Sequence, residues 1–186
     1  MRLFVALEIP VSVREALAEL IKEMRDIAPK VKWVRAQNLH VTLKFLGETA
    51  AEKLDAISTS LESVRSEATV EMEFRGLGFF PNQKRARVLW AGVKASANLS
   101  GLAGDVDRAL TTMGFPAETR EFTPHLTLAR FDPPGLSPAL IKAVESKDMR
   151  SWGVLRTGKF HVIQSKLRAT GAEYTTLRSF QFAAEA

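Results

Sequence analysis

The hydrophobic residues of the chain follow two repeating patterns. In residues 13–27, apolar side chains recur every three or four positions, which places them on one face of an α-helix: Val13, Leu17, Leu20, Ile21, Met24 and Ile27. Similar spacing predicts helices over residues 51–65, 98–113 and from Ser137 to about Lys147. Short β-branched or alternating runs predict strands over residues 2–8, 31–35, 40–46, 69–78, 87–94, 119–122, 125–130, 154–165 and 173–182.

The starts of three predicted helices carry capping signals. Ser12 with Glu15, and Thr49 with Glu52, have the spacing of a capping box, in which the two side chains bond each other's backbone amides. Ser137-Pro138 supplies an N-cap residue followed by a first-turn proline. We therefore expect these residues to define helix N-termini.

The sequence also contains a long-range repeat. His40-Val41-Thr42-Leu43 recurs as His125-Leu126-Thr127-Leu128, 85 positions later, and the same offset carries Arg2-Leu3-Phe4-Val5-Ala6 onto Arg87-Val88-Leu89-Trp90-Ala91. Each half is predicted to be a β-α-β-β-α-β unit, the order of ferredoxin-like folds. We therefore predict an α+β fold in which residues 1–186 form a single domain of two pseudo-symmetric lobes, at about 1–83 and 84–186.

Length and composition narrow the class of protein. With 186 residues, 46% hydrophobic and 25% charged, the chain has the balance of an ordinary soluble globular protein. No apolar run approaches the roughly 20 residues of a membrane-spanning helix, so we expect no membrane association. The absence of cysteine excludes disulfides, a thiol nucleophile and a Cys-ligated zinc site, and we expect a cytoplasmic location. The formal net charge of +5 favours an anionic partner.

The repeated tetrad carries the candidate chemistry. His40 and His125, two of the three histidines, open its two copies. Side chains two positions apart in a strand point to the same face, so each histidine shares a face with Thr42 or Thr127. The alternate positions, which would face a core, are apolar: Val41, Leu43, Phe45, Leu126 and Leu128. The pattern therefore predicts two imidazoles and two hydroxyls that line one cleft.

These segments resemble a known superfamily. Residues 39–48 and 122–130, with the opening at 2–7 and the ending marked by Ser165, Gly171 and Tyr174, are similar to the 2H phosphoesterases. Within that superfamily they resemble the RNA 2′,3′-cyclic phosphodiesterases, also called 2′-5′ RNA ligase-like proteins. The resemblance covers essentially the whole chain, and paired His-x-Thr motifs are specific to the superfamily. It departs where family members often have Gly-Pro near the C-terminal hairpin and this chain has Gly171-Ala172.

The resemblance implies a bilobal fold of antiparallel sheets, with the two motifs facing each other across a central cleft. It implies hydrolysis of an RNA 2′,3′-cyclic phosphate end, or of a cyclic nucleotide, to a 2′-phosphate without a metal or other cofactor. By analogy with the family, His40 is the proton donor and His125 the proton acceptor. Thr42 and Thr127 would donate hydrogen bonds to the phosphate, and Arg130 would bind it. The residue types suit the reaction, because histidines near neutral pH can serve as acid or base.

Strand alternation predicts the directions of two cationic side chains next to the motifs. Strict alternation places Arg130 on the face opposite His125, so we expect the strand to end or bulge there, or the side chain to reach around. Lys44 falls on the His40 face, where we expect at most a contact with a nucleic-acid backbone.

Other functions fit parts of the sequence. Ligation of RNA 2′-5′ ends would use the same site in reverse, and the sequence does not separate it from hydrolysis. A non-catalytic RNA-binding module would predict decay of at least one His-x-Thr motif, and both are intact. A histidine-ligated metal site has two candidate ligands, fewer than the usual three of catalytic zinc. We expect a monomer, because a bilobal body can cover its own core.

The remaining candidates carry weaker signals. His161 has no motif around it and is expected to be a surface or satisfied strand histidine. The basic residues 83–87 fit either phosphate contacts or a solvated loop. Four aromatic residues could stack on a nucleobase, although strand aromatics are more often part of a core: Trp33, Phe79, Phe80 and Tyr174.

Overall fold

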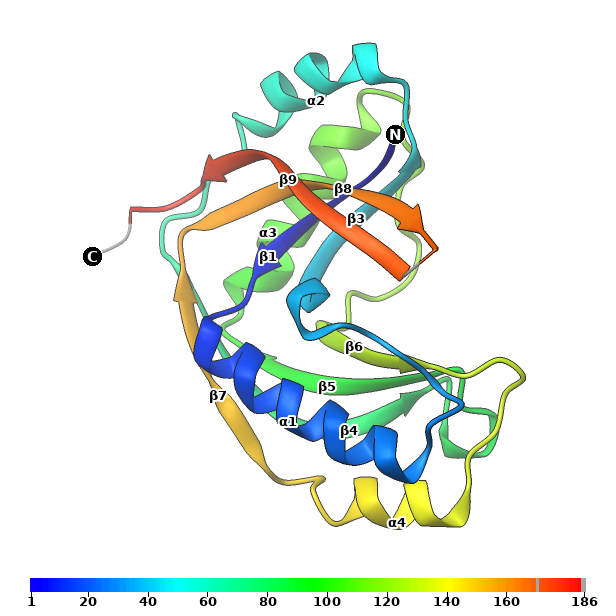
Figure 1. Cartoon of the computed structure of the whole chain (residues 1–186). Helices are drawn as coiled ribbons and strands as arrows, with labels where there is room; N and C mark the ends of the chain where they lie inside the picture. The colour runs from blue at the N-terminus through cyan, green and yellow to red at the C-terminus, as the bar shows by residue number, and fades with distance from the viewer. Residues whose placement is uncertain (170, 185–186) are drawn as a thin grey trace.

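The computed structural model describes residues 1–169 and 171–184, and its strands form two antiparallel sheets (Figure 1). The first sheet has the order β3 (His40–Glu48), β1 (Arg2–Glu8), β8 (Lys159–Arg168) and β9 (Gly171–Gln181). The second has the order β2 (Lys32–Trp33), β6 (His125–Arg130), β5 (Val88–Ala95), β4 (Val70–Phe80) and β7 (Ser151–Thr157). Strands β1 and β6 have the bounds that the sequence predicts.

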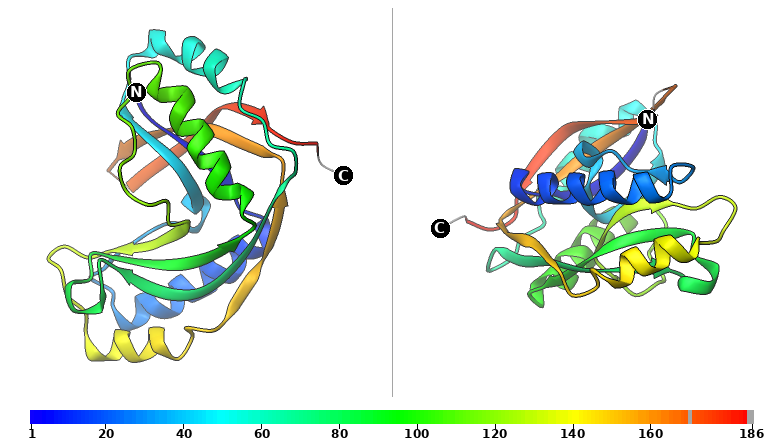
Figure 2. Two further views of the ribbon diagram at one scale, coloured as in Figure 1. Left: turned by 180° about the vertical axis from the view of Figure 1, so that it is seen from behind. Right: turned by 60° about the horizontal axis from the view of Figure 1, so that its bottom comes forward.

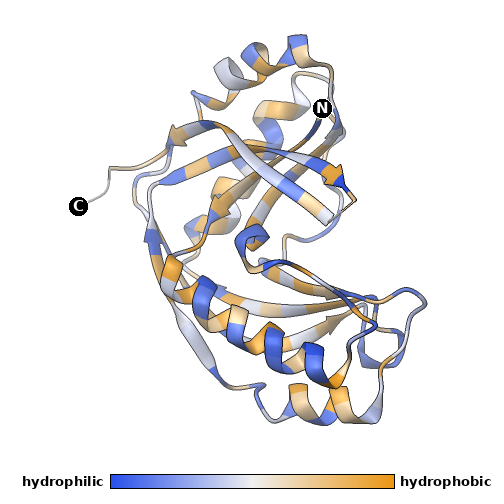
Figure 3. Ribbon diagram, viewed as in Figure 1, coloured by the Kyte–Doolittle hydropathy of each residue, from blue (hydrophilic) through white to orange (hydrophobic). Residues whose placement is uncertain are grey.

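The described α-helices pack in two pairs, one against each sheet. α2 (Leu54–Leu61) and α3 (Asn98–Thr111) lie together over the first sheet, and α1 (Val11–Ile27) and α4 (Pro138–Glu145) lie together over the second (Figure 2). Short 3₁₀ turns add η1 (Ala36–Asn38), η2 (Ala51–Lys53) and η3 (Gln83–Arg85). Hydrophobic and hydrophilic residues alternate along α1, as expected of a helix with one buried face (Figure 3).

One main core cluster joins both sheets and both helix pairs. Strand β1 is buried on both faces, because Leu3, Val5 and Leu7 enter this core while Phe4 and Ala6 form a second small cluster with Ile163 on the other side. The second cluster lies beside His40, whose ring stacks on Phe4. Across residues 1–169 and 171–184, no helix is long and apolar enough to cross a membrane.

Two of the three predicted helix starts are wrong. α1 begins at Val11 with Pro10 in the N-cap position, so Ser12 lies inside the first turn and makes no capping bond. The Thr49 hydroxyl donates to Gly47 O, and the segment begins as the 3₁₀ turn η2 before α2 starts at Leu54. In contrast, the Ser137 hydroxyl accepts a hydrogen bond from Leu140 N at 3.2 Å, as predicted.

Residues 119–122, predicted as a strand, form a loop that leads into β6. The polar side chains of Glu118 and Arg120 bond each other, and Glu118 also accepts from the backbone N–H of residues 119 and 120. This local hydrogen bonding replaces pairing with a neighbouring strand.

The sheets do not coincide with the sequence halves 1–83 and 84–186. The first sheet pairs β1 and β3 with β8 and β9, and the second pairs β4 with β5. For one strand, the offset that relates the two halves in the structure also differs from the offset of the sequence repeat. Ala6 pairs with Thr42, and Trp90 pairs with Thr127, so β1 corresponds to β5 at an offset of 84 instead of 85. At that offset the core-facing Val5 and Leu7 correspond to the core-facing Leu89 and Ala91.

Candidate active site

The two motif strands meet where the sheets approach each other. β3 is an edge strand of the first sheet, β6 lies next to the short β2 at the edge of the second, and β3 and β6 contact each other. His40 and His125 are both half-buried at the start of their strands, and the positive charge of His125 lowers the pKa of the His40 imidazole, so the two rings are electrostatic neighbours. The fold therefore brings the two predicted histidines together.

Both imidazoles are oriented in the same way. Nδ1 of His40 lies 2.7 Å from Asn38 O, and Nδ1 of His125 lies 2.8 Å from Thr123 O. A carbonyl oxygen only accepts, so each Nδ1 carries the hydrogen and donates it. In the neutral ring the lone pair is then on Nε2, which is free of this bond. Each histidine thus has the tautomer in which Nε2 can take a proton.

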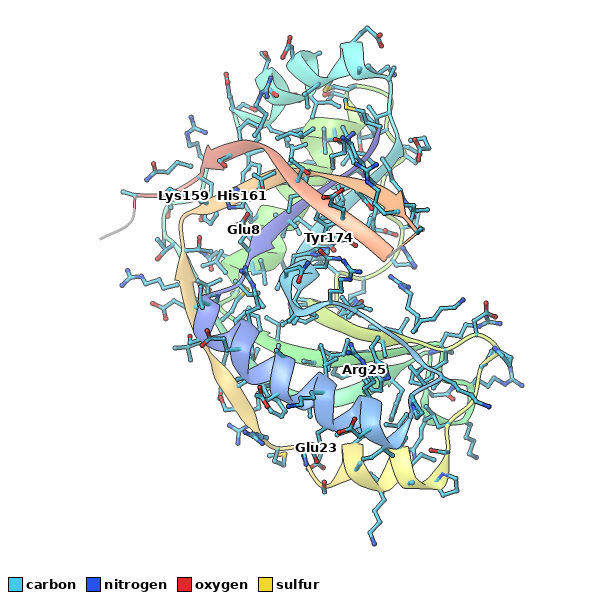
Figure 4. The ribbon with its side chains drawn as sticks, viewed as in Figure 1. Glu8, Glu23, Arg25, Lys159, His161 and Tyr174 are labelled. Carbon is cyan, nitrogen blue, oxygen red and sulfur yellow. The ribbon has the colours of Figure 1, made fainter. Side chains whose placement is uncertain are left out.

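Aromatic side chains hold each ring in place. The rings of Phe4 and His40 are stacked with centroids 4.5 Å apart, and Tyr174 meets His40 edge-on at 5.3 Å. On the other side, Phe80 meets His125 edge-on at 4.9 Å. Figure 4 labels Tyr174 on β9, where the first sheet faces the second. Such contacts restrict the rotation of an imidazole before any substrate binds.

The environment of His40 favours the neutral ring. Burial lowers the pKa of His40 to about 4. The hydrogen bond to the Asn38 backbone acts in the opposite direction, and the positive charge of His125 lowers the pKa further. At neutral pH, His40 is therefore uncharged in the empty site.

A bulge in each motif strand changes which side chains face the site. Opposite β5, Trp90 pairs with Thr127 but Leu89 pairs with Ala129, so Leu128 is an extra residue in β6. Leu128 and Ala129 are both buried, and Arg130 returns to the face of His125. The bulge that the sequence left as one of three possibilities is therefore the one that the structure contains.

Arg130 is also close to the first sheet. Burial raises the pKa of Tyr174, and the positive charges of Arg130 and Arg2 act against this shift. The Arg130 guanidinium thus lies within electrostatic range of the phenol that packs on His40.

The bulge in β3 overturns two sequence predictions. Val5 pairs with Lys44 but Ala6 pairs with Thr42, so Leu43 is the extra residue. Lys44 consequently points away from the His40 face and is buried, with its ammonium bonded to Asp107 and, at 2.7 Å, to Pro116 O. Phe45, predicted for the core, is 63% exposed and faces Phe4 at 6.0 Å.

The four aromatic candidates fall into two groups, and His161 and residues 83–85 have structural roles. Tyr174 contacts the His40 ring and Phe80 contacts the His125 ring, whereas Trp33 and Phe79 pack against the main core. His161 is half-buried, its Nδ1 lies 2.9 Å from Ser179 Oγ, and burial lowers its pKa, so it is a satisfied strand histidine as predicted. Residues 83–85 form the turn η3, where Asn82 accepts from Arg85 N.

Sequence reasoning missed Asn38, a buried residue two positions before His40. Its backbone oxygen holds the His40 ring, and its side-chain amide donates to Ala172 O at 2.7 Å. A polar residue just before a motif strand was the available signal. Phe4 was also missed, because a phenylalanine in an apolar strand reads as core. In the described part of the chain, no group of three or more His, Cys, Asp or Glu side chains is arranged to hold a metal ion.

This chain is similar in sequence to known proteins. The family described as LigT-like phosphoesterase matches residues 7–90 and 93–173. Curated relatives include RNA 2′,3′-cyclic phosphodiesterases of Archaeoglobus fulgidus, 36% identical over 97% of this chain and 100% of the relative, and of Aquifex aeolicus, 36% identical over 96% of each.

Two solved structures have similar folds. A crystal structure of a Thermus thermophilus protein is 29% identical with a TM-score of 0.78, covering 98% of each chain. The crystal structure of Escherichia coli LigT with 3′-AMP is 26% identical, also with a TM-score of 0.78, covering 97% of each. These similarities confirm the α+β fold with two antiparallel sheets that the sequence predicts.

Proposed function

The chain belongs to the LigT-like phosphoesterase family, and from this premise we propose that it hydrolyses RNA 2′,3′-cyclic phosphate ends to 2′-phosphates. The observation that carries the proposal is the matched pair of imidazoles. Each Nδ1 donates to a backbone oxygen two residues earlier in the chain, which leaves each Nε2 for the substrate. The relatives named RNA 2′,3′-cyclic phosphodiesterase support the choice of substrate.

In the proposed reaction, Nε2 of neutral His125 accepts a proton from water as the water oxygen bonds to phosphorus. The bond from phosphorus to O3′ breaks, and protonated His40 delivers its Nε2 proton to O3′. The products are a 2′-phosphate and a free 3′-hydroxyl. Two histidines on opposite sides of the phosphate can supply the base and the acid of such a displacement.

Three other side chains are assigned to the phosphate. Thr42 lies on the same strand face as His40, and Thr127 lies on the same strand face as His125. Their hydroxyls would donate to the non-bridging oxygens. Arg130, turned to the same face by the bulge at Leu128, would add a charge-assisted pair of hydrogen bonds. Such donors act where negative charge develops in the transition state.

The low pKa of His40 requires one further step. An acid must carry a proton, whereas a ring with a pKa of about 4 is neutral at pH 7. An opposite charge within about 4–6 Å favours the charged form of an ionisable group. We propose that the anionic phosphate raises the pKa of His40 when it binds, so that the substrate itself favours protonation of the acid.

The proposal takes the chain to act on RNA as a monomer in the cytoplasm. Both motif strands come from one chain and contact each other within it, so the pair of histidines needs no second copy. The relative from Escherichia coli was crystallised with 3′-AMP, which fits a site that accepts a ribonucleotide. The cytoplasmic location rests on the cysteine-free sequence.

The test is hydrolysis of a nucleoside 2′,3′-cyclic monophosphate in the presence of EDTA. We expect a 2′-phosphate product from wild type, and a loss of about 10²–10⁴-fold in kcat for His40→Ala and for His125→Ala. His161→Ala, which removes the third histidine, is the matched control and should retain activity. Equal activity in all four proteins, or activity abolished by EDTA, would exclude the two-histidine mechanism.

A further inference from the structure

A hollow of about 730 Å³ lies beside His40 and is not used by the reaction described above. It lies between η1 and the hairpin of β8 and β9, and its volume is in the range of about 300–1,000 Å³ that is usual for ligand sites. The residues that line it are mostly polar: Arg35, Gln37, Asn38, Arg168, Ala169, Ala172, Glu173 and Tyr174.

Two of the lining residues connect the hollow to the catalytic histidine. Asn38 accepts the hydrogen of His40 Nδ1 through its backbone oxygen, and Tyr174 packs edge-on against the His40 ring. The side-chain amide of Asn38 donates to Ala172 O and so ties η1 to the hairpin. The hollow therefore shares a wall with the proposed active site, and a partly buried hydrogen bond holds this wall in place.

The charge of the hollow favours an anion. It has two arginines, both exposed, and one carboxylate. Arg35 Nε lies 3.8 Å from the position of a Cβ on Gly171, the residue whose backbone pairs with Arg168, so the Arg35 side chain reaches the hairpin that carries Arg168. Arg168 Nε lies 3.0 Å from Glu173, but both side chains are more than half exposed. Such a surface pair contributes little and can exchange its partner for a phosphate.

We propose that this hollow binds the nucleotide that precedes the cyclic end of an RNA, with Arg35 and Arg168 on the connecting phosphodiester. The inference rests on the proposed function. The phosphodiester leaves the terminal ribose through its 5′ oxygen, so it is present in every RNA chain and absent from a nucleoside 2′,3′-cyclic monophosphate. The substrate class is accordingly an oligoribonucleotide of at least two residues, which the hollow distinguishes from a cyclic mononucleotide.

The test compares two substrates that differ only in the preceding nucleotide: adenosine 2′,3′-cyclic monophosphate, and the dinucleotide ApA with the same cyclic end. Wild type should have the higher kcat/KM on the dinucleotide. Arg35→Ala and Arg168→Ala should each lower that value by about tenfold, the effect of losing one charged hydrogen bond, and leave the mononucleotide value within about twofold. Arg108→Ala on α3, which removes the same charge away from the hollow, is the control for net charge and should change neither value.

Turnover of the mononucleotide also reports folding, because a misfolded variant loses activity on both substrates. The proposal is overturned if wild type treats the two substrates alike, or if both arginine variants lower the two rates equally. A binding measurement separates this result from failure of the proposed function. Without any turnover, the same variants are titrated with ApA 2′-phosphate and adenosine 2′-phosphate. Weaker binding of the dinucleotide alone in Arg35→Ala and Arg168→Ala would support the hollow, and unchanged binding would reject it.

Discussion

Phe45 and Arg130 occupy equivalent positions in the two motif strands, each two residues past a leucine that bulges out of register with the neighbouring strand. Phe45 pairs with Phe4 past the bulge at Leu43, and Arg130 pairs with Val88 past the bulge at Leu128. Each bulge turns the side chain two residues later to the histidine face. The repeat thus preserves the geometry and changes the chemistry, with an aromatic ring on one sheet and a guanidinium on the other.

Substitution of Arg130 should affect binding of the phosphate and leave the fold intact. We expect Arg130→Ala to lower kcat/KM for a cyclic nucleotide by about 10–100-fold, because a hydrogen bond to a charged group contributes about 1.5–3 kcal/mol. Arg130→Lys keeps the charge but loses the planar pair of donors and should recover only part of the activity. Arg178→Lys, on β9, is the matched control. The melting temperature should be unchanged in all variants, and full activity of Arg130→Ala would remove Arg130 from the site.

Loss of the Asn38 side chain should disturb the orientation of His40, because the Asn38 backbone oxygen holds the His40 ring. Asn38→Ala leaves Ala172 O without its donor and should lower the free energy of unfolding by about 1–2 kcal/mol. Because η1 is then less firmly held, the Asn38 O that orients His40 loses its fixed position, and kcat for a cyclic mononucleotide should fall by about tenfold. Asn82→Ala removes an exposed asparagine cap from η3, far from His40 in the sequence, and should leave kcat unchanged. Retained kcat in Asn38→Ala, with the stability lost, would limit Asn38 to a structural role.

The pKa of His40 has consequences for stability. The folded protein holds the pKa at about 4, below the value of 6.5 that applies to the unfolded chain. Between these values the unfolded chain binds a proton that the native protein does not, so the free energy of unfolding falls as the pH is lowered from 6.5 toward 4. His40→Gln does not titrate and should remove this part of the pH dependence in urea unfolding.

The same ring can be followed by NMR titration. His40 should titrate near pH 4 in the free protein, and addition of a nucleoside 2′-phosphate should raise its pKa. An ordinary pKa in the free protein would contradict the effect of burial. An unchanged low pKa in the complex would instead favour His40 as the base and His125 as the acid.

The packing of Trp90 requires a glycine at position 78, because the Trp90 ring lies directly against Gly78. A Cβ at this position would be 2.2 Å from the ring, so the indole must move in Gly78→Ala. We expect a loss of about 1–3 kcal/mol in the free energy of unfolding. Trp90 packs on Phe80 at 5.3 Å, and Phe80 packs on His125, so kcat should fall as well. Gly101→Ala in α3, where the added Cβ meets nothing within 4 Å, is the control and should be neutral or stabilising. Equal stability of the two variants would contradict this packing.

The local pattern was sufficient to predict the two motif strands and to single out their histidines. Alternation and turn residues predicted β1 and β6 with their observed bounds, and the repeated tetrad identified His40 and His125 as a pair. These features depend on neighbouring residues only, because strand alternation and helix periodicity are properties of a short stretch of backbone. Arg130 was identified through the family resemblance. The direction of its side chain could not be derived from strand alternation, because the bulge at Leu128 changes the face on which it lies.

The tertiary structure decided which side chains meet. Lys44 and Phe45 exchange faces because Leu43 is an extra residue opposite β1, and a register between strands far apart in sequence cannot be read from one strand alone. The same holds for the sheets, which combine strands from both halves, and for Asn38, whose partner Ala172 lies 134 positions away. The sequence by itself therefore determined the chemical groups and the elements that carry them. Pairing between distant strands determined their direction, their environment and the hollow beside His40.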